Sequence, residues 1–326
     1  MVRSEGLQRF SGPRNLAVDA PRFLPDVAAI RDNLLMCTTC WKCEEVCPAN
    51  LLLPEAMLRV RERIFSDKDM LEGHRRIAEN IDRYGRSVEP GDAADKSPSK
   101  KTGDVMYFPG CISKERISSI YESSMSVLEK VGTDFGVPDK WVCCGAPLEK
   151  IGDSKRLKVL REENLTRFEG FSQVVTSCPG CTSHFLTHYG IESLHTIEFL
   201  YENIGLSRLR FRQSSRKIRI ALHHPCHLAR TIGPHVIDYA YAILQMVPGV
   251  ELVEMEDPGS CCGGGGGVVA GYPRIALDLA SEKVRKAMAV RAELVLAPCP
   301  FCVLNLRRAD LLEIGEFTSF LNERLE

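Results

Sequence analysis

Short apolar runs that end in turns alternate with longer amphipathic stretches over the last two thirds of the chain. The runs typical of strands lie at 105–108, 141–142, 174–175, 218–223, 250–254 and 294–297. The stretches with a helical period of apolar residues lie at 118–131, 154–168, 237–246 and 276–290. This alternation predicts an α/β fold with parallel sheets, in which a βαβα unit occurs twice in tandem.

The first third of the chain has a different pattern. Residues 53–70 and 73–84 are amphipathic and predict helices, whereas 13–25 is expected to be an extended arm of the kind that lies along a partner subunit. The segment 86–103 is polar and rich in Pro, Gly and Ser, so we expect a linker. The predicted units are an arm with a small helical domain, a linker and two α/β domains, at 1–85, 86–103, 104–215 and 216–326.

The composition is that of a globular protein without a strongly charged partner. Hydrophobic residues make up 44% and charged residues 26% of the 326 positions, which is typical of a chain with a packed core. With 42 basic and 43 acidic residues the formal net charge is -1. We therefore expect no nucleic acid partner and no attraction to an anionic membrane surface.

The location predicted from the sequence is the cytoplasm. Residues 1–10 lack the apolar region of a signal peptide, and the longest uncharged stretch, 170–191, contains a Pro-Gly pair, histidines and many hydroxyls. We expect no transmembrane segment, so that any membrane association is peripheral and occurs through a partner. Because cytosolic thiols stay reduced, the 14 cysteines indicate metal or redox chemistry rather than disulfides.

The first cysteine group has the spacing of a ferredoxin-type loop. The run CTTCWKCEEVCP contains Cys37, Cys40, Cys43 and Cys47 in the pattern C-x2-C-x2-C-x3-C-P. This spacing is typical of a [4Fe-4S] site, whereas zinc sites more usually have two pairs of ligands about a dozen residues apart. In two-cluster ferredoxins the last cysteine serves the other cluster. Three roles are therefore open for Cys47. It closes this cubane, which we favour, or it serves a cluster in a partner, or it is a structural thiol.

The other ten cysteines form two copies of one pattern. Each copy has a single cysteine, a CCG triplet and a CxxC pair, with gaps of 31 and 33 residues in the first and 34 and 36 in the second. The first set is Cys111, Cys143, Cys144, Cys178 and Cys181, and the second set is Cys226, Cys261, Cys262, Cys299 and Cys302. A five-cysteine pattern that recurs after 115–121 residues indicates an internal repeat.

Each set follows predicted strands, where a parallel sheet binds its ligands. A cubane has four iron sites for four terminal thiolates. A fifth cysteine therefore indicates an unusual cluster, a bridging thiolate or one idle thiol. Five thiolates also exceed the four ligands of a tetrahedral zinc site, so a zinc-binding structural protein is the least favoured alternative.

Glycines and polar residues beside the cysteines are candidates for contacts around a cluster. Gly145 follows the first vicinal pair, and Gly263, Gly264 and Gly265 begin the run of five after the second pair. Such glycines let backbone N–H groups approach cluster sulfides, and the alternative is a flexible turn. The sequence HHPCHLAR contains four polar residues with two alternative roles. They donate protons or bind an anion, or they hydrogen-bond a cluster or cap the following helix. They are His223, His224, His227 and Arg230.

The paired five-cysteine elements resemble the CCG-domain, or cysteine-rich domain, family over residues 104–326. Every position of the C, CCG and CxxC pattern is filled in both copies. The family includes catalytic subunits of heterodisulfide reductase and iron–sulfur subunits of thiol-dependent fumarate reductase and of glycolate, lactate and glycerol-3-phosphate dehydrogenases. The run CCGGGGGVVAG is most similar to the heterodisulfide reductase branch, although many relatives carry two cubane motifs and this sequence has one.

The resemblance implies one [4Fe-4S] cubane and two noncubane [4Fe-4S] clusters that face each other across the repeats. It implies an oxidoreductase subunit that receives electrons through the cubane and reduces a small disulfide. The alternative is an electron-transfer subunit of a flavin-dependent hydroxy-acid or glycerol-3-phosphate dehydrogenase, which passes electrons to a quinone or carrier. The sequence has no flavin or nicotinamide fingerprint, so either function requires a partner subunit, a flavoprotein or an iron–sulfur protein.

Overall fold

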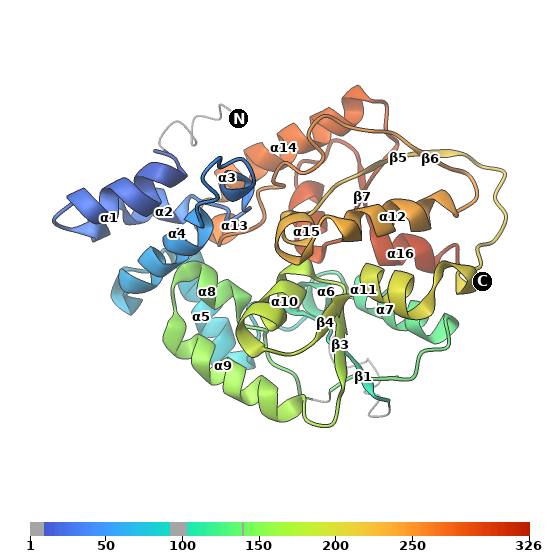
Figure 1. Ribbon diagram of the computed structural model, residues 1–326, viewed down its shortest axis with the longest axis horizontal. Helices are drawn as coiled ribbons and strands as arrows, with labels where there is room; N and C mark the ends of the chain where they lie inside the picture. The colour runs from blue at the N-terminus through green and yellow to red at the C-terminus, as the bar shows by residue number, and fades with distance from the viewer. Residues whose placement is uncertain (1–9, 92–102, 139) are drawn as a thin grey trace.

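Two four-stranded parallel sheets organise the fold (Figure 1). The computed structural model describes residues 10–91, 103–138 and 140–326. The first sheet has the order β2-β1-β3-β4 and the second has the order β6-β5-β7-β8, with parallel pairing inside each sheet. The prediction of an α/β fold with two parallel-sheet repeats is confirmed.

The strands of the two repeats correspond one to one. Their bounds are β1 Val105–Tyr107, β2 Phe135–Gly136, β3 Gln173–Thr176, β4 Ser193–His195, β5 Ile218–Leu222, β6 Val250–Leu252, β7 Leu294–Ala297 and β8 Glu313–Glu316. Past β1, the backbone N–H of Phe108 donates to the carbonyl of Val175 at 2.8 Å. Past β5, the N–H of His223 donates to the carbonyl of Leu296 at 2.9 Å. Phe108 and His223 therefore occupy equivalent positions.

Two details of the strand prediction are wrong. Trp141 and Val142 lie in an irregular loop, and the strand of that region is β2, several residues earlier. The loop is held by packing instead of pairing, because the Trp141 ring packs edge-on against Phe108 with centroids 5.5 Å apart. The last strand of each sheet, β4 and β8, was not predicted, since SLH and EIGE contain no run of apolar residues.

The four long helices lie within a few residues of the predicted stretches. They are α7 Ser118–Lys130, α9 Ser154–Arg167, α12 His235–Gln245 and α14 Pro273–Ala289. The shorter helices are α6 Cys111–Glu115, α8 Ala146–Ile151, α10 Pro179–His184, η6 Phe185–Tyr189, α11 Thr196–Glu198, η7 Phe199–Ile204, η8 Leu206–Arg208, η9 His227–Ile232, α13 Val268–Gly271, α15 Pro300–Arg307 and α16 Phe317–Asn322. One apolar core joins the repeats, because Val127 of α7 packs in the same buried cluster as Ile220 of β5.

The N-terminal unit is helical, as predicted. Its elements are η2 Asn15–Asp19, α1 Ala20–Phe23, η3 Val27–Ile30, α2 Arg31–Leu35, α3 Lys42–Glu45, α4 Leu53–Arg63, η4 Asp67–Asp69 and α5 Glu72–Tyr84. The extended arm expected at 13–25 is wrong, because η2 and α1 bury Leu16 against Leu34 and Met57. Of the predicted linker 86–103, residues 92–102 lie outside the described residues.

No helix in the described part of the chain has both the length and the apolar character that crossing a bilayer requires.

Arg61 of α4 lies where the N-terminal unit and the two repeats meet, and 1% of the residue is exposed. Its Nη1 donates to the carbonyls of Lys150 at 2.6 Å and Gly266 at 3.0 Å. Its Nη2 donates to the carbonyls of Leu34 at 2.6 Å and Cys37 at 2.7 Å. These acceptors belong to all three units, so one guanidinium ties them together.

Replacing Arg61 with Met is expected to lower the free energy of unfolding by about 3 kcal/mol or more, because four carbonyls lose a charged donor in a buried place. The matched control is Arg59→Met in the same helix, where an exposed ion pair to Glu55 is lost. This control should cost less than about 0.5 kcal/mol. Denaturant titration of the anaerobically purified protein measures both, and equal midpoints for the two variants would contradict the bridging role.

Candidate metal centre

The cysteines of both repeats gather at the carboxyl ends of the central strands. Cys111 begins α6 just past β1, and Cys178 precedes α10 just past β3. Cys226 and Cys299 occupy the matching places after β5 and β7. Because β1 pairs with β3 and β5 pairs with β7, the strand order itself brings distant cysteines together.

The thiols of the first set form a continuous chain of contacts. Cys111 hydrogen-bonds Cys143, which in turn contacts Cys144. Cys181 lies between Cys144 and Cys178 and contacts both. Hydrogen bonds from Cys143 and Cys181 lower the pKa of Cys144 to about 6, whereas the hydrogen bond to Cys143 and burial raise the pKa of Cys111. The five thiols therefore behave as one interacting group.

The second set repeats this order. Cys226 contacts Cys261, and Cys261 contacts Cys262. The sulfur atoms of Cys262 and Cys302 are 3.2 Å apart, and Cys302 contacts Cys299. The repeat seen in the sequence is thus also a repeat of side-chain contacts.

The two sets meet at Cys178 and Cys299, whose side chains hydrogen-bond each other. Each is the first cysteine of its CxxC pair. From this meeting point the contacts run outward in the same order in each set, from the CxxC pair to the vicinal pair and then to the single cysteine. The ten thiols therefore form a single line in which the two sets face each other.

The N-terminal motif lies against the second repeat. Cys40 hydrogen-bonds Cys261, and Cys37 and Cys40 lie close to Cys43. Burial, reinforced by these two neighbouring thiols, raises the pKa of Cys43 to about 11. Cys47 is half-buried after α3, and the centre that it serves stays a prediction.

The glycines beside the vicinal cysteines direct backbone donors at sulfur. The N–H of Gly263 lies 3.3 Å from the sulfur of Cys261, and the N–H of Gly264 lies 3.3 Å from that of Cys262. Gly145 has a φ of +96°, a left-handed conformation that disfavours any side chain. These positions suit the predicted contact between backbone N–H groups and a cluster.

The rest of the glycine run has a role that the sequence did not suggest. A Cβ atom on Gly265 would lie 2.6 Å from the carbonyl oxygen of Thr38, and one on Gly266 would lie 2.2 Å from that of Cys37. Both distances are shorter than contact. These two glycines therefore let the N-terminal cysteine loop pack directly on the second repeat.

The four polar residues around Cys226 have different polar contacts. His223 is buried, with 1% exposed, and it shares a space with the sulfur atoms of Cys262 and Cys302. His224 is directed to a different neighbour, because its Nε2 lies 3.0 Å from the hydroxyl of Tyr241. Only the first of these two histidines faces the second set.

His227 and Arg230 have separate neighbours. The Nδ1 atom of His227 lies 3.5 Å from the sulfur of Cys226, and burial, helped by nearby Lys150, lowers the pKa of His227 to about 4. Arg230 pairs with Glu45 at 2.5 Å and donates to the carbonyl of Cys40 at 3.3 Å. Arg230 is thus a second clamp between the N-terminal loop and the second repeat.

Sequence reasoning missed a cluster of Glu149, His184 and His188 beside the first set. The Glu149 carboxylate lies 2.8 Å from Nε2 of His188 and 3.5 Å from Nδ1 of His184, with Nζ of Lys150 at 2.9 Å. Burial alone would raise the pKa of Glu149, but hydrogen bonds from both histidines and the charge of Lys150 bring it below its usual range. The signal in the sequence was a pair of histidines four residues apart after CPGC.

Lys283 of α14 was also missed, because a lysine in a long amphipathic helix is usually solvated. Here 1% of the residue is exposed, and Nζ donates to the carbonyls of Asp257 at 2.7 Å and Pro258 at 2.8 Å. Burial lowers its pKa to about 8, against the opposing effects of Asp257 and Cys262. A buried positive charge therefore lies beside the second set.

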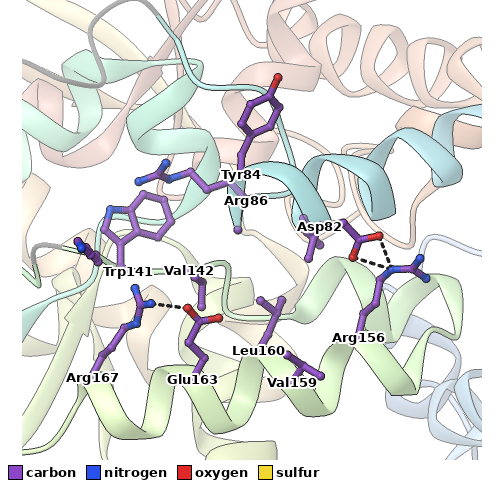
Figure 2. A pocket seen from close by; sticks show the side chains of 13 residues that line it. Asp82, Tyr84, Arg86, Trp141, Val142, Arg156, Val159, Leu160, Glu163 and Arg167 are labelled. Atoms are coloured by element: carbon purple, nitrogen blue, oxygen red, sulfur yellow. Dashed lines mark hydrogen bonds and ion pairs between the residues drawn. The ribbon is translucent and has the colours of Figure 1, made fainter.

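A cavity of about 570 Å³ opens between α5 and α9 (Figure 2). Its lining includes the ion pair of Arg156 with Asp82 at 2.9 Å and the pair of Arg167 with Glu163. Although Val142 reaches its wall, no cysteine of the described residues lines it. This cavity is therefore distinct from the cysteine sets.

The donor chemistry fits iron–sulfur clusters. All 14 cysteines are free thiols, and each repeat brings together five of them, more than a tetrahedral ion requires. Backbone N–H groups directed at sulfur and buried cations nearby are what a negatively charged cluster needs. If clusters bind, the N-terminal motif and the two five-cysteine sets would hold them.

A family model described as the CCG cysteine-rich domain matches residues 105–186 and 220–307. The chain is 34% identical over 293 residues to a fumarate reductase (CoM/CoB) subunit of Methanothermobacter marburgensis, covering 87% of this chain and 58% of that protein. It is 28% identical over 306 residues to a dihydromethanophenazine:CoB–CoM heterodisulfide reductase subunit of Methanosarcina mazei, covering 86% and 74%. The chain thus spans little more than half the length of the first of these relatives.

More distant similarities agree with this relationship. The chain is 24% identical over 243 residues to lactate utilization protein A of Oceanobacillus iheyensis, covering 68% of this chain and 98% of that protein. The crystal structure of a hypothetical protein from Helicobacter pylori has the same fold, with a TM-score of 0.56 and 11% identity over 98% of this chain and 63% of that one. Because both domain matches coincide with the two complete cysteine sets, the chain belongs to the CCG cysteine-rich domain family of iron–sulfur proteins.

Proposed function

We propose that the chain is the redox subunit of a disulfide reductase, with two noncubane [4Fe-4S] clusters in the CCG sets and one [4Fe-4S] cubane at the N-terminal motif. Bound iron–sulfur clusters accept and donate electrons one at a time. Reduction of a disulfide to two thiols, RS–SR′ + 2e⁻ + 2H⁺ → RSH + R′SH, needs two electrons. The observation that supports the proposal most is the contact of Cys178 with Cys299, because it would bring two one-electron centres close enough to act on one disulfide.

The residues beside this meeting point suit a small anionic thiol or disulfide. His227 lies close to Cys178 and to Lys150, Glu149 and His184. The ammonium of Lys150 can bind an anionic group. Two protons are consumed for each disulfide, and we propose that the cluster of Glu149 and its two histidines supplies them. The side chain of His188 is 35% exposed and that of His184 is 2% exposed, so Glu149 joins a solvent-facing imidazole to a buried one.

Electron entry at the N-terminal motif is supported by its contacts. Cys40 touches Cys261, which links the motif to the second set. Around Cys47 three apolar side chains face solvent, Val46 with 63%, Leu51 with 47% and Leu52 with 55% exposed. An apolar surface beside a redox site suits a partner protein, and the partner that we propose is a flavoprotein or iron–sulfur subunit that supplies electrons.

The second candidate function is an electron-transfer subunit of a flavin-dependent hydroxy-acid or glycerol-3-phosphate dehydrogenase. The similarity to lactate utilization protein A supports it. In that case electrons would pass along the same line of thiols to a quinone or carrier, without a disulfide between the sets. The two functions differ in whether a thiol perturbs the metal centres.

Anaerobically purified protein is expected to contain about 12 Fe per chain, from three four-iron clusters. Cys144→Ser and Cys262→Ser should each remove the electron paramagnetic resonance signal of one CCG centre and spare that of the N-terminal centre, because each proposed centre has its own set of cysteine ligands. Each variant is the control for the other. Iron near four per chain with stoichiometric zinc, or loss of every signal in a folded single variant, would refute the assignment of three centres.

Substrate binding is tested by adding a heterodisulfide of two small anionic thiols, and separately one of the thiols, to the oxidised protein. A thiol-dependent paramagnetic signal is expected in the wild type and not in Cys262→Ser, because both sets must act on one disulfide. If wild-type spectra stay unchanged while a hydroxy-acid-oxidising flavoprotein transfers electrons efficiently to the chain, the second candidate function replaces the first.

A further inference from the structure

The two five-cysteine sets differ at one pair of equivalent positions. Phe108 and His223 each follow the central strand of their sheet, make the same backbone hydrogen bond, and precede the first cysteine of their set by three residues. Phe108 belongs to an apolar cluster, with the ring centroid of Phe185 at 4.8 Å. In the second repeat the same place holds an imidazole.

The imidazole of His223 is buried, with 1% of the residue exposed, and neither ring nitrogen makes a well-formed hydrogen bond among the described residues, although the carbonyl of Pro258 lies close to it. A buried polar group without a well-formed hydrogen bond is costly, so such a group points to a missing ligand. Its ring nitrogen and the sulfur atoms of Cys262 and Cys302 lie within 4.8 Å of one another. The unused donor therefore faces the second set.

The nearest protein acceptor is already occupied. The carbonyl of Pro258 is close enough to hydrogen-bond one nitrogen of His223, but it also accepts from Nζ of Lys283 at 2.8 Å and from the backbone N–H of His224 at 3.1 Å. A carbonyl oxygen has two lone pairs, and both are used. The N–H of His223 is thus left for a group held by the cysteines.

Backbone donors to the two sets are alike, but side-chain donors differ: Ser87 hydrogen-bonds Cys111 in the first set, and His223 lies beside Cys262 and Cys302 in the second. Backbone N–H groups reach the vicinal cysteines in both repeats, at Gly145 in the first and at Gly263 in the second. Lys283 adds to the asymmetry, because its buried ammonium lies near Cys262. The second set therefore has both a side-chain donor and a cation.

We propose that His223 donates an N–H hydrogen bond to a sulfur of the iron–sulfur centre held by the second set, and that this raises the reduction potential of the second centre. The inference rests on the proposed function only in requiring a centre at each set. Hydrogen bonds to cluster or thiolate sulfur stabilise the added electron and raise the reduction potential. His223 is a positioning and tuning residue.

The test is a redox titration followed by paramagnetic resonance, in which the second centre is identified by the signal that Cys262→Ser removes. His223→Phe places the residue of the first repeat in the second. It should lower the equilibrium constant for reduction of the second centre at least tenfold, which is a fall of 59 mV in its midpoint potential for one electron. The N-terminal centre and the first centre should not change. His223→Gln keeps an N–H donor and should give a smaller shift.

The matched control is His224→Gln, which alters a neighbouring histidine directed at Tyr241 and should leave all potentials unchanged. Full iron content with an unchanged potential in His223→Phe would overturn the inference and leave the proposed function intact. If folded His223→Phe lost about four irons, the hydrogen-bond inference would be overturned, because the loss would mean that His223 binds the iron of the second centre directly. Wild-type protein without iron at the second set would remove the proposed function as well.

Discussion

One buried cation holds the relative positions of the three cysteine groups. Arg61 has only backbone carbonyls as its acceptors among the described residues, from the N-terminal unit, the first repeat and the second repeat. A buried charge is costly unless its hydrogen bonds are complete, so each of these carbonyls must stay in place. Because one acceptor is Cys37 and another is Gly266, the N-terminal cysteine loop is held on the glycine run, which brings Cys40 to Cys261.

Duplication explains most of what surrounds this arrangement. Two parallel sheets of the same order present cysteines at the same strand ends, and the contacts among them follow the same sequence up to the meeting of Cys178 and Cys299. The repeats differ at the equivalent positions of Phe108 and His223, three residues before the first cysteine of each set. Phe108 lies next to the first set where His223 lies next to the second, and the buried Lys283 lies beside the second set.

The sequence predicted the features that are local in the chain. Long amphipathic stretches identified α7, α9, α12 and α14, and cysteine spacing identified three groups, because both signals depend on neighbouring residues. It did not predict the helical conformation of the first segment, where Leu16 fills a space created by Leu34 and Met57. Nor did it predict the roles of Arg61 and Lys283, since an arginine or lysine within an amphipathic helix is usually solvated. Their roles come from packing between units distant in the sequence.

The proposed function requires two iron centres that face each other across Cys178 and Cys299, with a third beside Cys40. The most direct test is anomalous diffraction at the iron absorption edge from crystals of anaerobically purified protein. The account predicts three separate iron peaks, two flanking the Cys178–Cys299 contact and one at the N-terminal motif next to Cys261. Zinc in place of iron at the five-cysteine sets, or iron at only one of them, would contradict it.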